Sequence, residues 1–396
     1  MYDAKKVIEL ANAIKNEVIK DRRHIHENPE LAFREEQTSI YVQKKLDELG
    51  IEYETSYAKT GVVGIIRGKK GDGRCVLLRA DMDALPMQEK NDVEYRSKVD
   101  GCMHACGHDA HTAMLLGVAK VLKSMENDFC GTVKLMFQPA EEGDGGAEPM
   151  IKAGILNNPK VDGAFALHVE PNYECGTIAL KGGALMASPD GFKITVKGKG
   201  GHGAFPHLSI DPILTAAKIV EGLQSINSRN ISATTPAVVS VCQISGGEAY
   251  NIIPDTVTLS GTTRAFDMET RKELFDRIEK ISNGICTAMG ASCECEFEYM
   301  FPPLINDDDM TNLVINVASE VIGKDNVLEL KKPFMGGEDF SYIANEVEAA
   351  YFYLGCRNEE KGLVNPWHSS KFDIDEDCLS IGIGIMANCA LKYLER

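Results

Sequence analysis

The segment MHACGHDAH, at residues 103–111, concentrates side chains that could bind a metal ion or act as a nucleophile. It holds three of the nine histidines in a chain of 396 residues, together with Cys106 and Asp109. Thiolates and imidazoles are the ligands that zinc and several other transition metals prefer in proteins. The segment therefore indicates either a metal site or a reactive thiol.

Three kinds of site could use this cluster: a structural zinc site, a cysteine nucleophile, or a metal site whose other ligands lie elsewhere in the chain. A structural zinc site needs four ligands in two spaced pairs; Cys102 and Cys106 with nearby histidines could supply half of one, but no second pair follows. A cysteine nucleophile needs a histidine base that folding places beside it, and Cys106 and His108 are too close along the chain for this. Residues two apart point in opposite directions on a helix. Joint metal ligation by Cys106 and His108 therefore requires a loop, and Asp109 is expected to cap the helix that follows.

Three short apolar segments predict buried strands, and each one ends in a cluster of polar residues. A helical pattern over 111–125 separates the first two, and this alternation predicts a parallel or mixed sheet covered by helices on both faces. The carboxyl ends of such strands meet at one edge, where ligands usually bind. We therefore expect one shared site beyond the strands at 75–80, 132–138 and 163–167.

Further ligand candidates lie at this predicted edge. The second strand runs into PAEEGDGGA, where Glu141 and Glu142 could divide their roles, one carboxylate binding metal and the other accepting a proton. His168 follows the third strand, and His368 follows a later strand, next to the only tryptophan. These side chains could complete a metal site with the thiol and imidazole of the first cluster.

The pattern of predicted elements changes at about residue 186. From there the order is strand, helix, strand, strand, helix, strand, which is the split unit of ferredoxin-like domains. We therefore predict an α/β protein whose mixed-sheet catalytic domain is formed by 1–185 and 300–396, with an inserted ferredoxin-like α+β domain at 186–299. Hinges at about 185 and 300 would let the inserted domain close over a substrate.

The inserted domain begins with GKGGHGAFPH, which contains the spacing G-x-G-x-x-G. After a strand, this spacing can indicate dinucleotide binding. The next helix is expected only near Asp211, Pro206 intervenes, and the following strands have the ferredoxin-like order. Nucleotide binding is therefore not expected.

Composition favours a soluble globular protein in the cytoplasm. The formal charge of −17 argues against nucleic acid or an anionic membrane as a partner, because both attract clustered lysine and arginine. Residues 1–30 predict an amphipathic helix without the apolar core of a signal peptide, and no segment approaches the roughly 18 apolar residues of a membrane span. The twelve cysteines are expected to be reduced and mostly buried.

Eight motifs in order along the chain resemble the amidohydrolase branch of the M20 metallopeptidase family: RADMDALP, MHACGHDAHTAM, FQPAEEGDGGA, LHVEP, GKGGHGAFPH, YNIIPDTVTLSGTTR, GGEDFSY and HSSKFD. That branch includes hippurate hydrolases, N-acyl-amino-acid amidohydrolases, acetyl-diaminopimelate deacetylases and plant auxin-conjugate hydrolases. Related carboxypeptidases and desuccinylases carry a histidine in place of Asp81 and an aspartate in place of Cys106. These departures favour the amidohydrolase branch over a true peptidase.

The resemblance implies a centre of two divalent metal ions per subunit, of manganese, zinc, cobalt or nickel. Glu141 would be the general base, and Asp83 would steady a ligand. Cys106 would bridge the two ions. The other ligands would be His108, Glu142, His168 and His368.

The resemblance also implies that the inserted domain is a lid and the interface of a homodimer. His202 would stabilise the oxyanion, usually in the active site of the partner subunit. Asn251 and Arg264 would bind the free carboxylate of the substrate, although Arg264 could instead form a surface salt bridge.

The sequence thus predicts a metal-dependent amidohydrolase that cleaves N-acyl amino acids, with an acetyl, benzoyl or similar acyl group, to a carboxylic acid and a free amino acid. An N-acetyl-diaminopimelate deacetylase is the alternative within this class. A dipeptidase or carboxypeptidase and a non-catalytic metal-dependent binding protein are further alternatives. Glu141 argues against the last of these, because a pure binding protein has no need of a base beside a complete ligand set.

Overall fold

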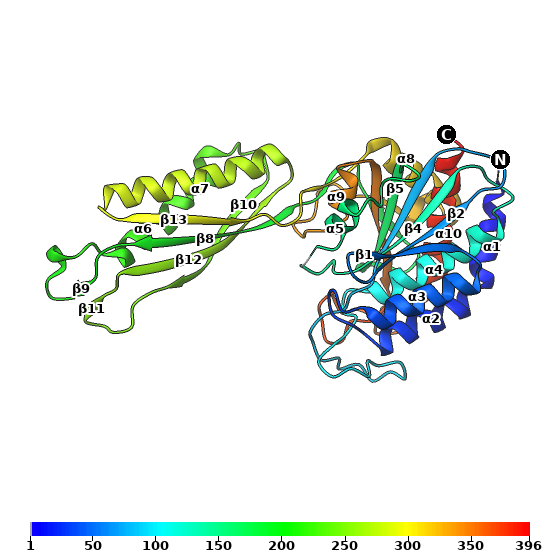
Figure 1. Ribbon diagram of the computed structural model, residues 1–396, viewed down its shortest axis with the longest axis horizontal. Helices are drawn as coiled ribbons and strands as arrows, with labels where there is room; N and C mark the ends of the chain where they lie inside the picture. The colour runs from blue at the N-terminus through cyan, green and yellow to red at the C-terminus, as the bar shows by residue number, and fades with distance from the viewer. Residues whose placement is uncertain (1, 144) are drawn as a thin grey trace. The chain divides into compact units, whose positions relative to one another are not determined.

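The chain forms two compact units in a computed structural model that describes residues 2–143 and 145–396 (Figure 1). Each unit has its own hydrophobic core. In the described part of the chain, no helix has the length and hydropathy of a membrane span. The first unit comprises the chain up to Gly183, Ile305–Lys332 and Asp339–Arg396; the second comprises Ala184–Leu304 and Pro333–Glu338.

The first unit contains a mixed sheet, as predicted. It has eight strands, in the order β1-β2-β4-β3-β5-β16-β6-β15. Strand β3 is parallel to β4 and β5, β16 is parallel to β5, and β2 is antiparallel to β4. Strands covered on both faces consist of continuous apolar runs, and every residue of β3 is buried. The bounds are β1 (Glu52–Tyr57), β2 (Gly61–Arg67), β3 (Cys75–Asp81), β4 (Thr132–Gln138), β5 (Gly163–Glu174), β6 (Ile178–Leu180), β15 (Val327–Glu329) and β16 (Glu348–Arg357).

Helices α4 and α10 pack against β3 and β5 and against each other. Gly382 of α10 permits this approach, because a Cβ at that position would lie 2.4 Å from Sδ of Met114 on α4. The helices of this unit are α1 (Ala4–Ala13), α2 (Lys15–Glu27), α3 (Glu36–Glu48), α4 (His108–Ser124), α5 (Ala147–Lys152), α8 (Asp308–Ile322), α9 (Ser341–Ala344) and α10 (Cys378–Leu394).

The single helix expected near the N-terminus is in fact two helices, α1 and α2. They meet at Ile14, whose φ of −95° and ψ of 0° depart from the helical path. The break lets α1 pack on α10 while α2 packs on α4. The prediction was wrong because the apolar pattern alone does not mark this change of direction.

The second unit has the predicted ferredoxin-like order of elements around an antiparallel sheet, β10-β12-β8-β13. The glycine-rich segment contains a short strand, β9, and is followed by a single 3₁₀ turn at Pro206–Leu208 instead of an α-helix. Helix α6 begins later, where Asp211 Oδ1 accepts a hydrogen bond from the amide of Ile213. The elements are β8 (Ser188–Lys197), β9 (Gly201–His202), α6 (Pro212–Leu223), β10 (Ala237–Ser245), β11 (Ile252–Ile253), β12 (Thr256–Ala265), α7 (Met268–Ala288) and β13 (Ser292–Glu298); β7 (Gly183–Met186) and β14 (Leu304–Asn306) lie where the chain passes between the units.

Candidate metal centre

The turn between Cys106 and His108 requires a glycine. Gly107 has a left-handed φ of 89°, and a Cβ there would lie 2.3 Å from Cγ2 of Val169 on β5. Helix α4 begins immediately afterwards, so Cys106 lies in the predicted loop and His108 at the start of the helix. This close approach to β5 places Cys106 Sγ 3.4 Å from Nε2 of His168.

Backbone carbonyls orient two of the candidate histidine ligands. The Nδ1 atom of His108 lies 2.8 Å from the carbonyl oxygen of Asp83, and Nδ1 of His168 lies 2.8 Å from the carbonyl oxygen of Val169. A carbonyl only accepts hydrogen bonds, so both Nδ1 atoms donate, and Nε2 is the nitrogen of each ring that could bind a metal ion. Histidines that bind metals are commonly held in this way.

The carboxylate of Asp83 connects His108 to the pair Glu141 and Glu142. Its Oδ1 accepts a hydrogen bond from the amide of Glu141, and its Oδ2 accepts one from the amide of Glu142, each at 3.0 Å. Burial opposes ionisation of Asp83, but the contacts with His108 and the two amides lower its pKa below the usual range. Asp83 therefore fixes the segment that carries both glutamates.

His368 reaches the site from the loop after β16. Its backbone amide donates to the carbonyl of Ala105 at 2.8 Å, and its Nε2 lies 3.1 Å from Oε1 of Glu142. The residue has a positive φ of 58°, a conformation that costs a non-glycine residue about 1–2 kcal/mol. Such conformations persist where surrounding contacts enforce them, often at functional sites.

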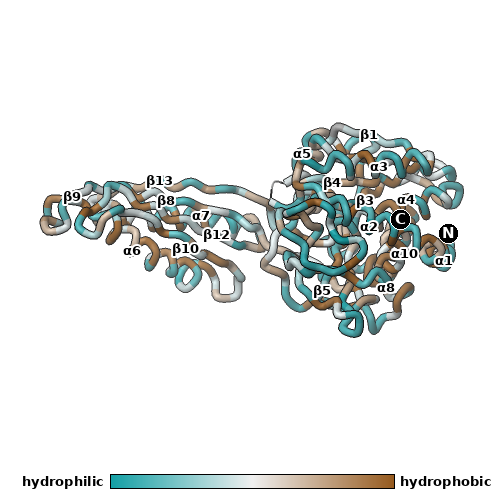
Figure 2. Tube along the Cα trace, turned by 90° about the horizontal axis from the view of Figure 1, so that it is seen from below, coloured by the Kyte–Doolittle hydropathy of each residue, from teal (hydrophilic) through white to brown (hydrophobic). Residues whose placement is uncertain are grey.

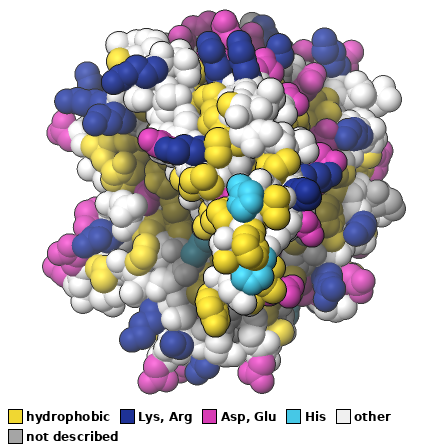
Figure 3. All heavy atoms as spheres, turned by 90° about the vertical axis from the view of Figure 1, so that its left-hand side faces the viewer, with side chains coloured by type: hydrophobic (Ala, Val, Ile, Leu, Met, Phe, Trp, Pro, Cys, Tyr) yellow, Lys and Arg dark blue, Asp and Glu magenta, His cyan; other side chains and the backbone are white. Residues whose placement is uncertain are grey.

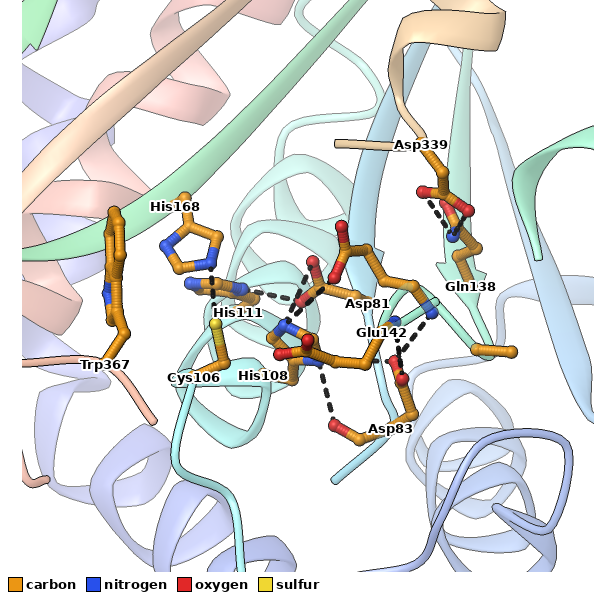
Figure 4. A network of polar contacts seen from close by, with 12 residues as sticks. Asp81, Asp83, Cys106, His108, His111, Gln138, Glu142, His168, Asp339 and Trp367 are labelled. Carbon is orange, nitrogen blue, oxygen red and sulfur yellow. Dashed lines mark hydrogen bonds and ion pairs between the residues drawn. The ribbon is translucent and has the colours of Figure 1, made fainter. Parts of the chain in front are cut away.

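The structure brings together the five candidate ligands and Glu141, and Figure 4 shows four of these ligands, Cys106, His108, Glu142 and His168. Within each of three groups, one potential ligand atom per residue lies within 4.8 Å of the others. Cys106 belongs to two of the groups, which suits a bridging ligand. The groups are Cys106, His108 and His168; Cys106, Glu142 and His368; and His108, Glu141 and Glu142.

The donor set fits divalent metal ions. Among the described residues, the buried Nε2 of His108 has no hydrogen-bond partner. Burial and then the carboxylates of Glu142 and Glu141 raise the pKa of the Cys106 thiol well above its usual range, so that thiolate formation needs added positive charge. Thiolate, imidazole and carboxylate ligands are compatible with zinc, manganese, cobalt or nickel.

A buried polar network beside these ligands was not predicted. His111 Nδ1 donates to Asp81 Oδ1 at 2.6 Å, and its Nε2 accepts from the amide of Val169 at 2.9 Å. Arg79 binds Asp81 and also Oδ1 of Asp339. The available signal was an arginine inside the otherwise apolar strand CVLLRA.

The prediction that Asp109 caps α4 was wrong. Gly107 is the N-cap residue, and no side chain caps this helix. Asp109 lies in the first turn, where its Oδ2 accepts from Nε of Arg22 at 2.7 Å and contacts Nδ1 of His26 at 2.8 Å. The glycine turn starts the helix two residues earlier than expected and directs this carboxylate towards α2.

The three remaining candidates lie in the second unit. His202 is exposed on β9, and its Nδ1 accepts from the amide of Ala204. Asn251 precedes β11, and its carbonyl accepts from the amide of Gly203. Arg264 on β12 donates to the carbonyl of Met335 at 3.1 Å. Their contacts with a substrate stay a prediction.

Comparisons with known proteins agree with the metal chemistry of this centre. The profile of peptidase family M20/M25/M40 matches residues 77–392. Thermostable carboxypeptidase 2 of Saccharolobus solfataricus is 45% identical over 98% of this chain and 99% of its own, and the N-acetylcysteine deacetylase of Bacillus subtilis is 39% identical over 97% and 98%. A crystal structure of a dinuclear metal-binding M20 peptidase from Bacillus subtilis superposes with a TM-score of 0.85 at 35% identity, covering 97% of this chain and 99% of that one.

Proposed function

The chain belongs to peptidase family M20/M25/M40 and is a hydrolase of amide bonds, and from this premise we propose that it hydrolyses N-acyl amino acids at a dinuclear metal centre. An acetylated amino acid and the C-terminal residue of a peptide share one feature, an amide on the nitrogen of an amino acid whose carboxylate is free. One relative is named a carboxypeptidase and another an N-acetylcysteine deacetylase, and this shared feature of their substrates supports the proposal. The observation that carries the proposal is the position of Glu141, whose carboxylate lies within 4.8 Å of potential ligand atoms of His108 and Glu142.

Two divalent ions would be held by Cys106, shared between them, and by the other four ligands, His108, Glu142, His168 and His368. When bound, they supply Lewis acidity, which lowers the pKa of a water molecule and polarises the amide carbonyl. The contacts that orient both imidazoles support this ligand set, because they occupy Nδ1 of each ring and leave Nε2 as the nitrogen that could bind a metal ion.

In the proposed reaction, Glu141 accepts a proton from the attacking water. The water oxygen bonds to the carbonyl carbon, the carbon–nitrogen bond breaks, and Glu141 returns the proton to the departing amine. Asp83 holds Glu141 in place through its backbone amide. We further propose that His202 donates to the oxyanion and that Asn251 and Arg264 bind the carboxylate of the substrate.

We also propose that the protein is a homodimer that associates through the second unit. Strand β10 is an edge strand of its sheet, and unpaired edges are templates for pairing with another chain. Hydrophobic residues recur along α6 and β10, and hydrophobic side chains and histidines gather on the face shown in Figure 3 (Figures 2 and 3). The exposed apolar side chains of this unit include Phe205, Leu208, Ile213, Leu214, Ile244, Tyr250 and Ile252.

Replacement of the proposed base tests the mechanism. We expect Glu141→Gln to lower kcat by about 10²- to 10⁴-fold on an N-acetyl amino acid, with unchanged metal content, because the amide keeps the shape but cannot accept the proton. Glu148→Gln, on the exposed face of α5, is the matched control. Full activity of Glu141→Gln with metal bound would refute the mechanism, and activity that survives complete chelation would refute the metal centre.

A carboxypeptidase is the second candidate, because a relative of that name is 45% identical. The two functions differ in the acyl side of the scissile amide, which is a small acyl group in one and a peptide in the other. Values of kcat/KM for acetyl and benzoyl amino acids, N-acetyl-diaminopimelate and peptides, measured with each metal ion, discriminate among them. Higher values for the acyl amino acids are expected.

A further inference from the structure

Helix α2 buries two basic side chains on the face that packs against α4. Arg22 and His26 are four residues apart, so they lie on the same side of the helix, and both are fully buried. A charge taken out of water is costly unless it is paired and hydrogen-bonded. Arg22 and His26 are paired with carboxylates from other segments of the chain, and the positions of these carboxylates indicate what the buried pair does.

Arg22 connects two segments that carry candidate metal ligands. Its Nε lies 2.7 Å from Oδ2 of Asp109, the residue directly after His108. Its Nη2 lies 2.8 Å from Oδ1 of Asp373, five residues after His368. One guanidinium thus holds the loop of the first cluster and the loop of His368 at fixed positions relative to α2.

His26 adds a third segment. Its Nδ1 contacts the same oxygen of Asp109 at 2.8 Å, and its Nε2 lies 3.2 Å from Oε1 of Glu89, in the segment that follows Asp83. Burial and Arg22 act to lower the pKa of His26, but the carboxylates outweigh them and raise it to about 9. The ring is therefore doubly protonated at neutral pH and donates from both nitrogens.

The same segments also contact one another directly. Asn91 donates to the carbonyl of Phe372 at 2.9 Å, and the hydroxyl of Tyr95 donates to Oδ2 of Asp373 at 2.7 Å. Four carboxylates from three segments of chain thus converge around Arg22 and His26, because Nη1 of Arg22 also lies 3.4 Å from Oε1 of Glu376. Without these cations they would repel one another in a buried environment.

We propose that Arg22 and His26 form a positioning clamp that sets the spacing of the metal-binding segments without touching the metal ions. This inference rests on the proposed metal centre. Outer contacts that fix ligand geometry are commonly worth 10- to 100-fold in metal affinity. The clamp would act through Asp109 on the loop of Cys106 and His108, and through Asp373 on the loop of His368.

Removing the cation tests the clamp. We expect Arg22→Met to weaken the affinity of the apo-protein for Co²⁺ or Zn²⁺ by about 10- to 100-fold, measured by competition with a chelator, and to change the thiolate-to-cobalt absorption of the Co²⁺ form. Arg22→Lys keeps the charge but loses the planar fork that reaches both carboxylates, so it should recover only part of the affinity. Asp373→Asn is a milder variant that removes one negative charge on the His368 side and leaves Glu376 in contact with Arg22.

Arg271→Met is the matched control, since Arg271 is a buried arginine paired with Asp190 in the second unit, with Nε 2.7 Å from Oδ2. It should lower the Tm of the apo-protein without changing metal affinity. If Arg22→Met and Asp373→Asn lower Tm in the same way but bind Co²⁺ and Zn²⁺ as tightly as the parent, the pair is only structural and the clamp is refuted. Failure of the parent protein to bind metal at all would refute the proposed function instead.

Discussion

At the scale of single residues, the ligand candidates were predicted from short polar motifs, of which only the one that holds Glu142 directly follows its strand, β4, while Cys106 and His108 lie at the start of α4. Cys106 and His168 are far apart in the chain, yet their ligand atoms lie 3.4 Å apart. Arg22 and His26 could not be found in this way, because basic residues on an amphipathic helix usually face solvent. The only clue was their spacing relative to Val18 and Ile25, which places all four on the buried side of α2.

Gly107 allows a prediction about the turn between two ligands. Gly107→Ala adds a Cβ that conflicts with Val169 and also strains a left-handed residue. We expect it to destabilise the apo-protein by at least about 1–2 kcal/mol and to reduce metal content. Gly101→Ala, with a φ of 73° but no atom within 4 Å of the added Cβ, shows the effect of strain alone. Urea unfolding measures the free energy of unfolding of both variants. If Gly107→Ala and Gly101→Ala lose the same unfolding free energy and the same metal content, the close contact between Gly107 and β5 is unimportant.

The raised pKa of His26 predicts how stability depends on pH. Because its folded-state pKa of about 9 exceeds the ordinary value of 6.5, its contribution is fully present below about pH 6.5 and is lost as the pH rises through about 9. The difference in unfolding free energy between the parent and His26→Gln should therefore shrink between about pH 6 and pH 10. Chemical denaturation of the apo-proteins measures it, and a constant difference would show that the ring is neutral throughout.

At the scale of elements, strands were easier to predict than the ends and breaks of helices. The segments at 75–80 and 132–138 correspond to β3 and β4, whereas β5 continues past its predicted end to Glu174. Its extra residues pair with β16, and this partner comes from much later in the chain. The break at Ile14 likewise depends on two different packing partners for α1 and α2, which local periodicity does not report.

Two glycines of α10 should respond in opposite ways to alanine. A Cβ at Gly382 would lie 2.4 Å from Met114 Sδ and 2.8 Å from Leu354 Cδ2, so Gly382→Ala should destabilise the protein through overpacking, by about 1–3 kcal/mol. At Gly384 the nearest atoms are 4.0 Å away, so Gly384→Ala should stabilise the helix by up to about 1 kcal/mol. Urea unfolding of the two variants checks both signs, and a stabilised Gly382→Ala would contradict the close packing of α4 on α10.

At the scale of the whole molecule, the change of element pattern near residue 186 was sufficient to predict an inserted ferredoxin-like fold. The strand order β10-β12-β8-β13 agrees with it. The segment Pro333–Glu338 joins the second unit although it follows in sequence long after that unit's other residues. No local signal marks this return, because it depends on contacts such as that between the carbonyl of Phe334 and the amide of Ala187.

The proposed homodimer can be tested at the edge of the second sheet. Ile244 on β10 is 58% exposed, and Ile244→Lys would place a charge on the proposed interface. We expect a dimer for the parent and a monomer for this variant in sedimentation velocity. Ile40→Lys replaces a similarly exposed residue of α3 in the first unit and should remain dimeric. A monomeric parent protein would refute the proposal.

The backbone carbonyls that orient His108 and His168 make the centre unequally tolerant of different kinds of genetic change. Because main-chain atoms aim these rings, exchanging the side chain of Val169 for another of similar size leaves the aim of His168 intact. Insertion or deletion of one residue in β5 before His168, in contrast, would shift the strand by one position against β3 and β16. The imidazole would then lie on the opposite face of the sheet. Natural variation along this strand should therefore consist of substitutions at constant length, with length changes confined to the loops that precede it.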